Sequence, residues 1–182
     1  AKFRAIFEGS KDGILLADVE SKRFITGNRA ICDMLQYSLD EIRRLGVTDI
    51  HPDEDLPRVL DAFERQARQE FEVAKDLPVK RKDGSVFFAD IKSSPVTISG
   101  KQYLIGNFRD VTERRETEEA LTRLGMAVDQ AAEAIVVTDT EGNIEYVNPA
   151  FERITGYSRL EAVGRSMRIL KSGKHDEKFY KE

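Results

Sequence analysis

The stretch YVNPAFERITGY occupies residues 146–157, and a related stretch, TGNRAICDMLQY, occupies residues 26–37. In both, an asparagine precedes apolar residues at helical spacing, and the pattern closes on a tyrosine. The similarity extends outward, so that residues 12–41 align with residues 133–161 across a one-residue gap. An ordered series of matches over this length indicates two copies of one folding unit.

Each copy predicts a β-hairpin followed by a helix. The first strand is a short apolar run that ends in aspartate, GILLAD at 13–18 and AIVVTD at 134–139. The second strand leads to Asn28 or Asn148, and asparagine is a favoured N-cap because its side chain accepts an unpaired N–H of the first helical turn. Pro149 suits the first position of the helix that follows.

The first copy continues where the second stops. Residues 53–70 predict an amphipathic helix, and residues 71–111 predict three antiparallel strands joined by the turns KDGS and ISGK. Alternation in the middle strand predicts one face made of Phe87, Ala89, Ile91 and Ser93. The order of elements predicts an α+β fold, with an antiparallel sheet and helices over one of its faces.

The composition excludes several classes of protein. The 29 Lys and Arg residues are mixed with 33 Asp and Glu, and the net charge of −4 argues against a nucleic-acid surface. The single cysteine, Cys32, excludes an internal disulfide and a multi-cysteine metal site, and fits a cytoplasmic location. No apolar run reaches the roughly 18 residues that a membrane helix needs, so no membrane contact is expected. We expect the chain to be a piece of a longer protein.

The second copy, from IVVTDTEGNIEYVNPAFERITGY onward, resembles the core of PAS domains, and RDVTERR at 109–115 resembles the Asp-Ile-Thr signature that closes them. The resemblance implies a tandem PAS sensor region of a bacterial signalling protein. Each complete domain is then a five-stranded antiparallel sheet with helices on one face and a pocket between. The expected domains are a first PAS domain at 1–111, a linker helix at 112–130 and half of a second PAS domain at 131–182. Such modules usually precede histidine kinase, cyclic-di-nucleotide or transcriptional output domains.

The second PAS unit is expected to lack its last three strands. A hairpin with an unpaired edge and an uncovered apolar face is marginally stable on its own. We therefore expect either a non-standard packing of this half or an exchange with a neighbouring chain. Exchange would bury Ile135, Val137 and Phe151 between two chains.

The linker helix is expected to leave the first domain at a relay segment made of Asp110, Val111 and Thr112. Apolar residues three and four apart predict a coiled-coil seam of a homodimer, formed by Leu121, Leu124, Val128, Ala131 and Ile135. The alternative is a single amphipathic helix that lies on its own domain. A change in the pocket would tilt the last strand and this helix, which requires two alternative packings.

The sheet face beneath the helices supplies the candidate ligand pocket. Its predicted residues are Leu16, Leu35, Ala89, Ile91, Leu104 and Phe108. All are apolar, and such a pocket suits an apolar or planar small molecule better than a charged metabolite. The alternative is an ordinary core without a ligand.

The resemblance raises haem and flavin as cofactors to consider, and the sequence indicates neither. Haem needs an axial ligand, and the two histidines, His51 and His175, both lie in polar, loop-like stretches. Flavin photoreceptors of the PAS superfamily carry a reactive cysteine where GRSMRILK at 164–171 has Met167. A thioether cannot form their photoadduct, so light sensing by that route is not expected.

No nucleophile–base pair is visible, and we expect no enzyme activity from this segment. Cys32 is interpreted as a small, partly buried apolar side chain. The acidic cluster is interpreted as the first turn of a helix rather than a metal site, and consists of Asp53, Glu54 and Asp55. The sequence thus predicts a non-catalytic sensory and dimerisation module that relays a change through its linker helix. The alternatives are a ligand-free dimerisation scaffold and a haem or flavin sensor.

Overall fold

The computed structural model describes residues 2–170 of the 182-residue chain. The chain divides into two compact units, and the boundary follows Glu116. This boundary lies inside helix α5 (Thr112–Gln130), so the first turn of the helix belongs to the first unit and the rest to the second.

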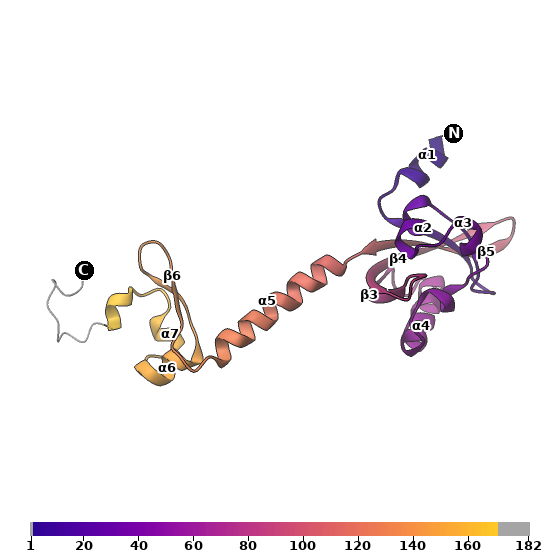
Figure 1. Cartoon of the computed structure of the whole chain (residues 1–182). Helices are drawn as coiled ribbons and strands as arrows, with labels where there is room; N and C mark the ends of the chain where they lie inside the picture. Colours follow the sequence, from indigo (N-terminus) through magenta and orange to yellow (C-terminus); the bar gives the residue numbers. More distant parts are fainter. Residues whose placement is uncertain (1, 171–182) are drawn as a thin grey trace. The chain divides into compact units, whose positions relative to one another are not determined.

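Within the described residues, the first unit contains a five-stranded antiparallel sheet with the strand order β2-β1-β5-β4-β3 (Figure 1). Its strands are β1 (Gly13–Asp18), β2 (Phe24–Gly27), β3 (Val73–Lys80), β4 (Val86–Ile98) and β5 (Lys101–Asp110). The last strand, β5, pairs with β1 on one side and with β4 on the other. The strand that leads into α5 is therefore the central strand of the sheet.

Short helices cover one face of this sheet and enclose the hydrophobic core with it. They are α2 (Arg29–Leu35), α3 (Leu39–Ile42), the 3-10 turns η1 (Val47–Ile50) and η2 (Asp53–Asp55), and α4 (Leu56–Ala67). The predicted cap is present, because the Asn28 side chain accepts the N–H of Ile31 at the start of α2. The predicted face of β4 is also present, because Phe87, Ala89, Ile91 and Ser93 are all buried. The α+β prediction is confirmed.

Helix α1 (Lys2–Gly9) is not among the predicted elements. Its residues Ile6 and Phe7 lie with Ile14 and Leu16 along the sheet face opposite to α2, α3 and α4. The sheet therefore has apolar side chains on both of its faces.

Strand β1 corrects one predicted pocket residue. Leu15 and Ala17 are buried in the core, whereas Leu16 points to the opposite face of the sheet beside Ile14. The prediction of Leu16 was wrong because Ile14, Leu15, Leu16 and Ala17 are all apolar, so alternation in the sequence cannot indicate which of the two faces is inside. Leu15 takes the place of Leu16.

The described part of the second unit repeats the start of the first. It contains β6 (Val136–Thr138), β7 (Ile144–Val147), α6 (Pro149–Thr155), α7 (Arg159–Ala162) and the 3-10 turn η3 (Met167–Leu170). A β-bridge between Asn143 and Ser166 matches the bridge between Arg23 and Gly46. The expectation of a non-standard packing is therefore wrong for this part.

A small separate core forms in the second unit from Ile144, Val147, Phe151 and Ala162. Phe151 is fully buried within its own unit, so one of the three residues that exchange would bury between chains is already covered in the single chain. Val137 remains 47% exposed. Exchange between chains stays a prediction.

Candidate functional site

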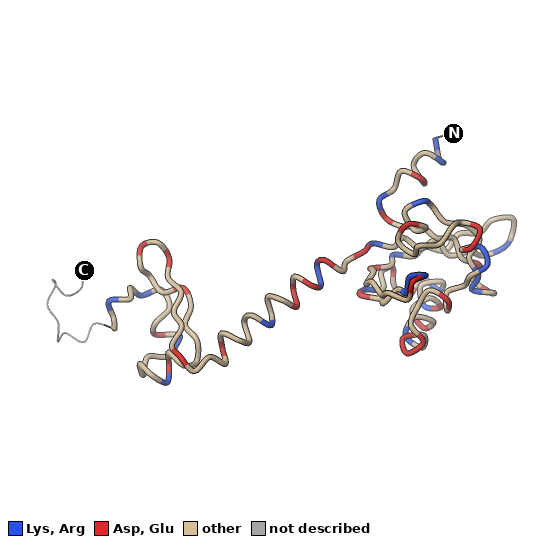
Figure 2. The backbone as a smooth tube through the Cα atoms, in the orientation of Figure 1, with Lys and Arg blue, Asp and Glu red and all other residues tan. Residues whose placement is uncertain are grey.

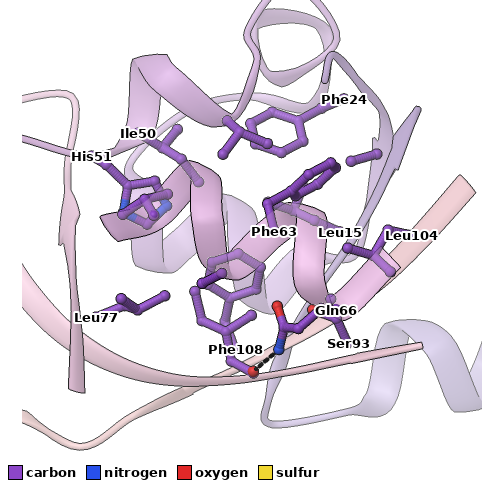
Figure 3. Close-up of a pocket in the computed structure, with 16 residues that line it drawn as sticks. Leu15, Phe24, Ile50, His51, Phe63, Gln66, Leu77, Ser93, Leu104 and Phe108 are labelled. Atoms are coloured by element: carbon purple, nitrogen blue, oxygen red, sulfur yellow. Dashed lines mark hydrogen bonds between the residues drawn. The ribbon is translucent and has the colours of Figure 1, made fainter. Parts of the chain in front are cut away.

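A cavity of about 40 Å³ lies in the first unit between the sheet and α4 (Figure 3). Its walls are mainly apolar and include the rings of Phe24, Phe63 and Phe108. All five strands of the sheet contribute residues to the wall, and the helical face contributes η1 and α4. Three buried polar residues also line it: His51, Gln66 and Ser93.

The predicted pocket residues divide into three groups. Ile91, Leu104 and Phe108 line this cavity. Leu35 and Ala89 are fully buried in the same core but do not line the cavity. Leu16 lies on the other face of the sheet, as described above. Burial and sheet face thus account for three of the residues, and the remaining wall comes from other sheet residues and from the helical face.

His51 is the polar residue whose place the sequence did not reveal. It lies between η1 and η2, in agreement with the loop-like stretch that the sequence indicates, but its side chain is only 2% exposed. Its Nδ1 lies 2.5 Å from the carbonyl oxygen of Pro78, and a carbonyl only accepts, so Nδ1 carries the proton. Burial lowers the pKa of His51 to about 4, which keeps the ring neutral near pH 7.

Gln66 and Ser93 form a second polar group of the cavity. The Gln66 side-chain nitrogen donates to the carbonyl oxygens of Glu72 and Ile91, at 3.0 and 2.9 Å. Figure 3 shows the bond to Ile91 as a dashed line, and the Gln66 side-chain oxygen is directed away from this bond. Two carbonyl neighbours fix the orientation of this amide, because only its nitrogen can donate to them.

Neither haem nor flavin fits this cavity. Sites for molecules of that size usually measure about 300–1,000 Å³, several times the volume found here. Nor do the described residues bring together three or more His, Cys, Asp or Glu side chains that could hold a metal ion. The acidic residues Asp53, Glu54 and Asp55 form the turn η2 before α4. His175 lies outside the described residues.

The predicted relay segment joins β5 to α5 through contacts with one residue of β4. The Phe88 carbonyl oxygen accepts the N–H of Val111 at 2.8 Å, and the Phe88 N–H donates to Thr112 Oγ1 at 3.0 Å. Asp110 accepts the N–H of Thr112 at 2.9 Å and lies 3.6 Å from the Arg81 guanidinium. The start of α5 is therefore bound to the sheet that lines the cavity.

Two family profiles match the chain. The one described as "PAS domain" matches residues 11–113, more than half of the chain, and the one described as "PAS fold" matches residues 123–182. The chain belongs to the PAS domain family. The tandem arrangement expected from the internal repeat is thus confirmed.

Known sensors and a solved PAS structure are similar to it. The chain is 32% identical over 92 residues to the oxygen sensor protein DosP of Escherichia coli, covering 50% of this chain and 12% of DosP. It is 25% identical over 162 residues to a methyl sulfide methyltransferase-associated sensor of Methanosarcina acetivorans, covering 89% of this chain and 15% of that protein. A PAS domain from Colwellia psychrerythraea superposes with a TM-score of 0.55 at 19% identity, over 62% of this chain and 97% of that one. The chain spans less than a sixth of the two curated sensors, and the solved structure supports the fold.

A buried asparagine performs the same task in both PAS units. Asn28 Oδ1 accepts the N–H of Ile14 and of Ile31, and Asn148 Oδ1 accepts the N–H of Ile135 and of Phe151. Each side-chain nitrogen donates to two carbonyl oxygens, one from the helix before the unit and one from the loop before the first strand. The carbonyls are those of Phe7 and Asp12 in the first unit, and those of Val128 and Glu133 in the second. The end of α5 is thus bound to the second PAS unit as α1 is bound to the first.

This asparagine contact corrects the predicted seam. Helix α5 ends at Gln130, so Ala131 and Ile135 lie outside it, and Ile135 instead donates its N–H to Asn148. Leu121 and Leu124 are both more than 60% exposed, and Val128 is half-buried. Of the five predicted seam residues, only Leu121, Leu124 and Val128 therefore lie within α5, and the seam itself stays a prediction.

The remaining candidates take structural positions. Cys32 is half-buried, and burial raises the pKa of its thiol. Met167 begins η3 and is 37% exposed, and its counterpart in the repeat, Val47, lines the cavity of the first PAS unit. Figure 2 shows acidic and basic residues interspersed along the described chain. Among residues 2–170, no helix is both long and apolar enough to cross a bilayer.

Proposed function

We propose that this chain is a non-catalytic, cytoplasmic sensory region in which the first PAS unit binds a small molecule and α5 relays the change toward an output domain. One observation carries the proposal: β5 both lines the cavity and leads into α5. Leu104, Gly106 and Phe108 line the cavity, and α5 begins at Thr112, two residues after β5 ends. A ligand that moves β5 would move the base of the helix.

The contacts at both ends of α5 support this relay. At the first unit, the Arg114 guanidinium lies 3.3 Å from Asp76 and 3.6 Å from Asp90. At the second unit, Tyr146 donates a hydrogen bond to Asp129 at 2.5 Å, next to the Asn148 contact with Val128. A helix bound at both ends transmits rotation or tilt better than a flexible linker does.

Homodimer formation through α5 is part of the proposal. Leu121, Leu124 and Met126 are each at least 59% exposed, although they are large and apolar. Leu121 and Leu124 are three residues apart and share one side of the helix, which supports a contact surface there. A second copy of α5 would cover the Leu121 and Leu124 positions, as in a short coiled coil.

A ligand-free dimerisation scaffold is the second candidate function. The observation that favours it is a hollow on the outer sheet face, lined almost wholly by apolar groups. Val96, Ile98 and Ile105 lie there beside Leu16, and Ile98 is 47% exposed. In this account the outer face and α5 set the geometry of a dimer, and the cavity holds only water.

Native mass spectrometry of the purified chain tests the proposal and separates the two candidates. We expect a retained small molecule that is released on unfolding, and a lower retained fraction in Gly106→Ala. A Cβ at residue 106 would lie 3.1 Å from the Phe108 ring and would narrow the cavity. A chain that carries no ligand from any source, yet is dimeric, would favour the scaffold instead.

A further inference from the structure

Three polar side chains line the cavity, and each has an atom without a protein partner. His51, Gln66 and Ser93 are 2%, 3% and 6% exposed. Among the described residues nothing hydrogen-bonds His51 Nε2, Gln66 Oε1 or the Ser93 hydroxyl. These atoms border the cavity space rather than packed protein, because Asp18 Oδ2 is the only buried side-chain nitrogen or oxygen of the described residues that lacks a hydrogen bond. Polar groups that line a cavity are normally satisfied by water or by a ligand, so this cluster points to a partner that is not part of the chain.

The free atom of each residue can be assigned as donor or acceptor. Nδ1 of His51 holds the ring proton against Pro78, and since the ring is neutral, Nε2 keeps its lone pair and accepts. Both amide hydrogens of Gln66 are used by backbone carbonyls, so its oxygen accepts. The Ser93 hydroxyl can do either. The cavity thus offers two fixed acceptors and one adaptable group.

The position of these atoms relative to the apolar wall restricts the partner further. Figure 3 shows His51 at one side of the cavity and Gln66 with Ser93 at another. Among residues 2–170, no Lys or Arg side chain lines the cavity, and an anion there would meet two acceptors without a compensating charge. A pure hydrocarbon would leave both acceptors unpaired, which is costly for buried groups.

We propose that this cavity binds a small neutral molecule that donates hydrogen bonds, of the amide or alcohol class, in preference to an anion or a hydrocarbon. The inference rests on the proposed function and names the ligand chemistry of that same site. A cavity of 40 Å³ has room for about three water-sized groups, at about 10–15 Å³ each. The ligand, or the end of it that enters, therefore has about three or four non-hydrogen atoms.

Three probes of equal size test the proposal: acetamide, acetone and acetate. Each probe is an acetyl group with one further substituent, which is the amide NH2 in acetamide, a methyl group in acetone and a negatively charged oxygen in acetate. The three probes therefore have nearly the same shape. The whole chain, labelled at its leucine and isoleucine methyl groups, is titrated with each probe and followed by NMR. We expect acetamide to shift the methyl signals of Leu15 and Leu104 saturably, with an affinity at least about tenfold higher than that of acetone or acetate.

Variants link this preference to the named atoms. Ser93→Ala removes only the hydroxyl, and we expect it to reduce the advantage of acetamide over acetone severalfold. Gln66→Met removes the acceptor at similar volume and acts in the same direction, although it also removes two bonds to the backbone. Gln102→Met, at an exposed position of β5, is the control and leaves the affinity for acetamide unchanged.

The outcomes separate this inference from the function on which it rests. Acetone binding as tightly as acetamide would overturn the inference while leaving a ligand cavity in place. Tighter binding of acetate would overturn it as well. If no probe shifts the methyl signals of the cavity, the inference fails, and native mass spectrometry of the retained molecule decides the proposed function separately.

Discussion

Acidification should destabilise the first PAS unit through His51 at a higher pH than through Asp18 or Glu41. The ring is buried, and burial lowers its pKa to about 4, against 6.5 for an unfolded histidine. The nearby Asp55 opposes this change, and Lys80 adds to it. Because the unfolded chain binds the proton first, stability is complete above about pH 6.5 and is lost as the pH falls toward about 4.

The size of the effect follows from the two pKa values. Full protonation in both states costs the folded unit about 3 kcal/mol, at about 1.4 kcal/mol per pKa unit. Between about pH 7.5 and pH 5, the loss is about 2 kcal/mol by the same relation. Lys101 and Ser21 hold the pKa of Asp18 well below its usual range, and Lys82 lowers that of Glu41 to about 2. Their contributions are lost only below the pKa of an unfolded carboxyl, about 4, so the two pH windows are separate.

Urea denaturation at a series of pH values, followed through a methyl signal of Ile91 or Leu104, measures this loss for the first unit alone. His51→Gln can still donate to Pro78 but does not titrate, and we expect its stability to be nearly constant from pH 7.5 to 5. His175→Gln replaces the other histidine of the chain and should keep the wild-type dependence. A wild-type stability that does not change above pH 5, or an unchanged dependence in His51→Gln, would refute the reasoning.

Three further substitutions test other parts of the structure. Leu15→Ala should destabilise the first unit by about 3 kcal/mol, whereas Leu16→Ala should cost less than about 1 kcal/mol, because only Leu15 faces the core. Chemical denaturation measures both free energies of unfolding, and equal losses would contradict the assignment of faces. Asn148→Ala should cost the second unit about 2–4 kcal/mol and speed hydrogen exchange in β7 and α6, and unchanged protection there would count against its role. Thr112→Val should cost about 1 kcal/mol and expose the amide of Phe88 to exchange, whereas Thr112→Ser should not; equal exchange in the two variants would exclude the Oγ1 contact.

Local patterns were sufficient to predict the sheet, the helix caps and one face of β4. The alternation from Phe87 to Ser93 can be read because the charged Asp90 and Lys92 flank Ile91 and mark the opposite face. In β1 four apolar residues follow one another, so the sequence could not tell Leu15 from Leu16. The pairing of β1 with β5 decides which of the two side chains faces the core, and β5 lies at the other end of the domain sequence.

The cavity itself could be predicted only in part, because its polar residues depend on contacts between distant segments. His51 reads as a polar loop residue, and it is buried because Pro78 in β3 accepts its Nδ1–H across 27 positions of sequence. Gln66 reads as the polar side of an amphipathic helix, yet its amide binds the backbone of β4. The linker helix was expected at 112–130, which are the bounds of α5, but the predicted seam ran on to Ile135, whose contact with Asn148 joins residues 13 positions apart.

The account depends most on the claim that the cavity and α5 are coupled through β5. Hydrogen–deuterium exchange of the whole chain, with its retained ligand and after the ligand has been removed, measures this coupling directly. We predict that ligand removal speeds exchange in β5 and at the Phe88 amide, and with them in the first turns of α5 after Thr112. Faster exchange that is confined to the cavity walls, with α5 unchanged, would contradict the relay.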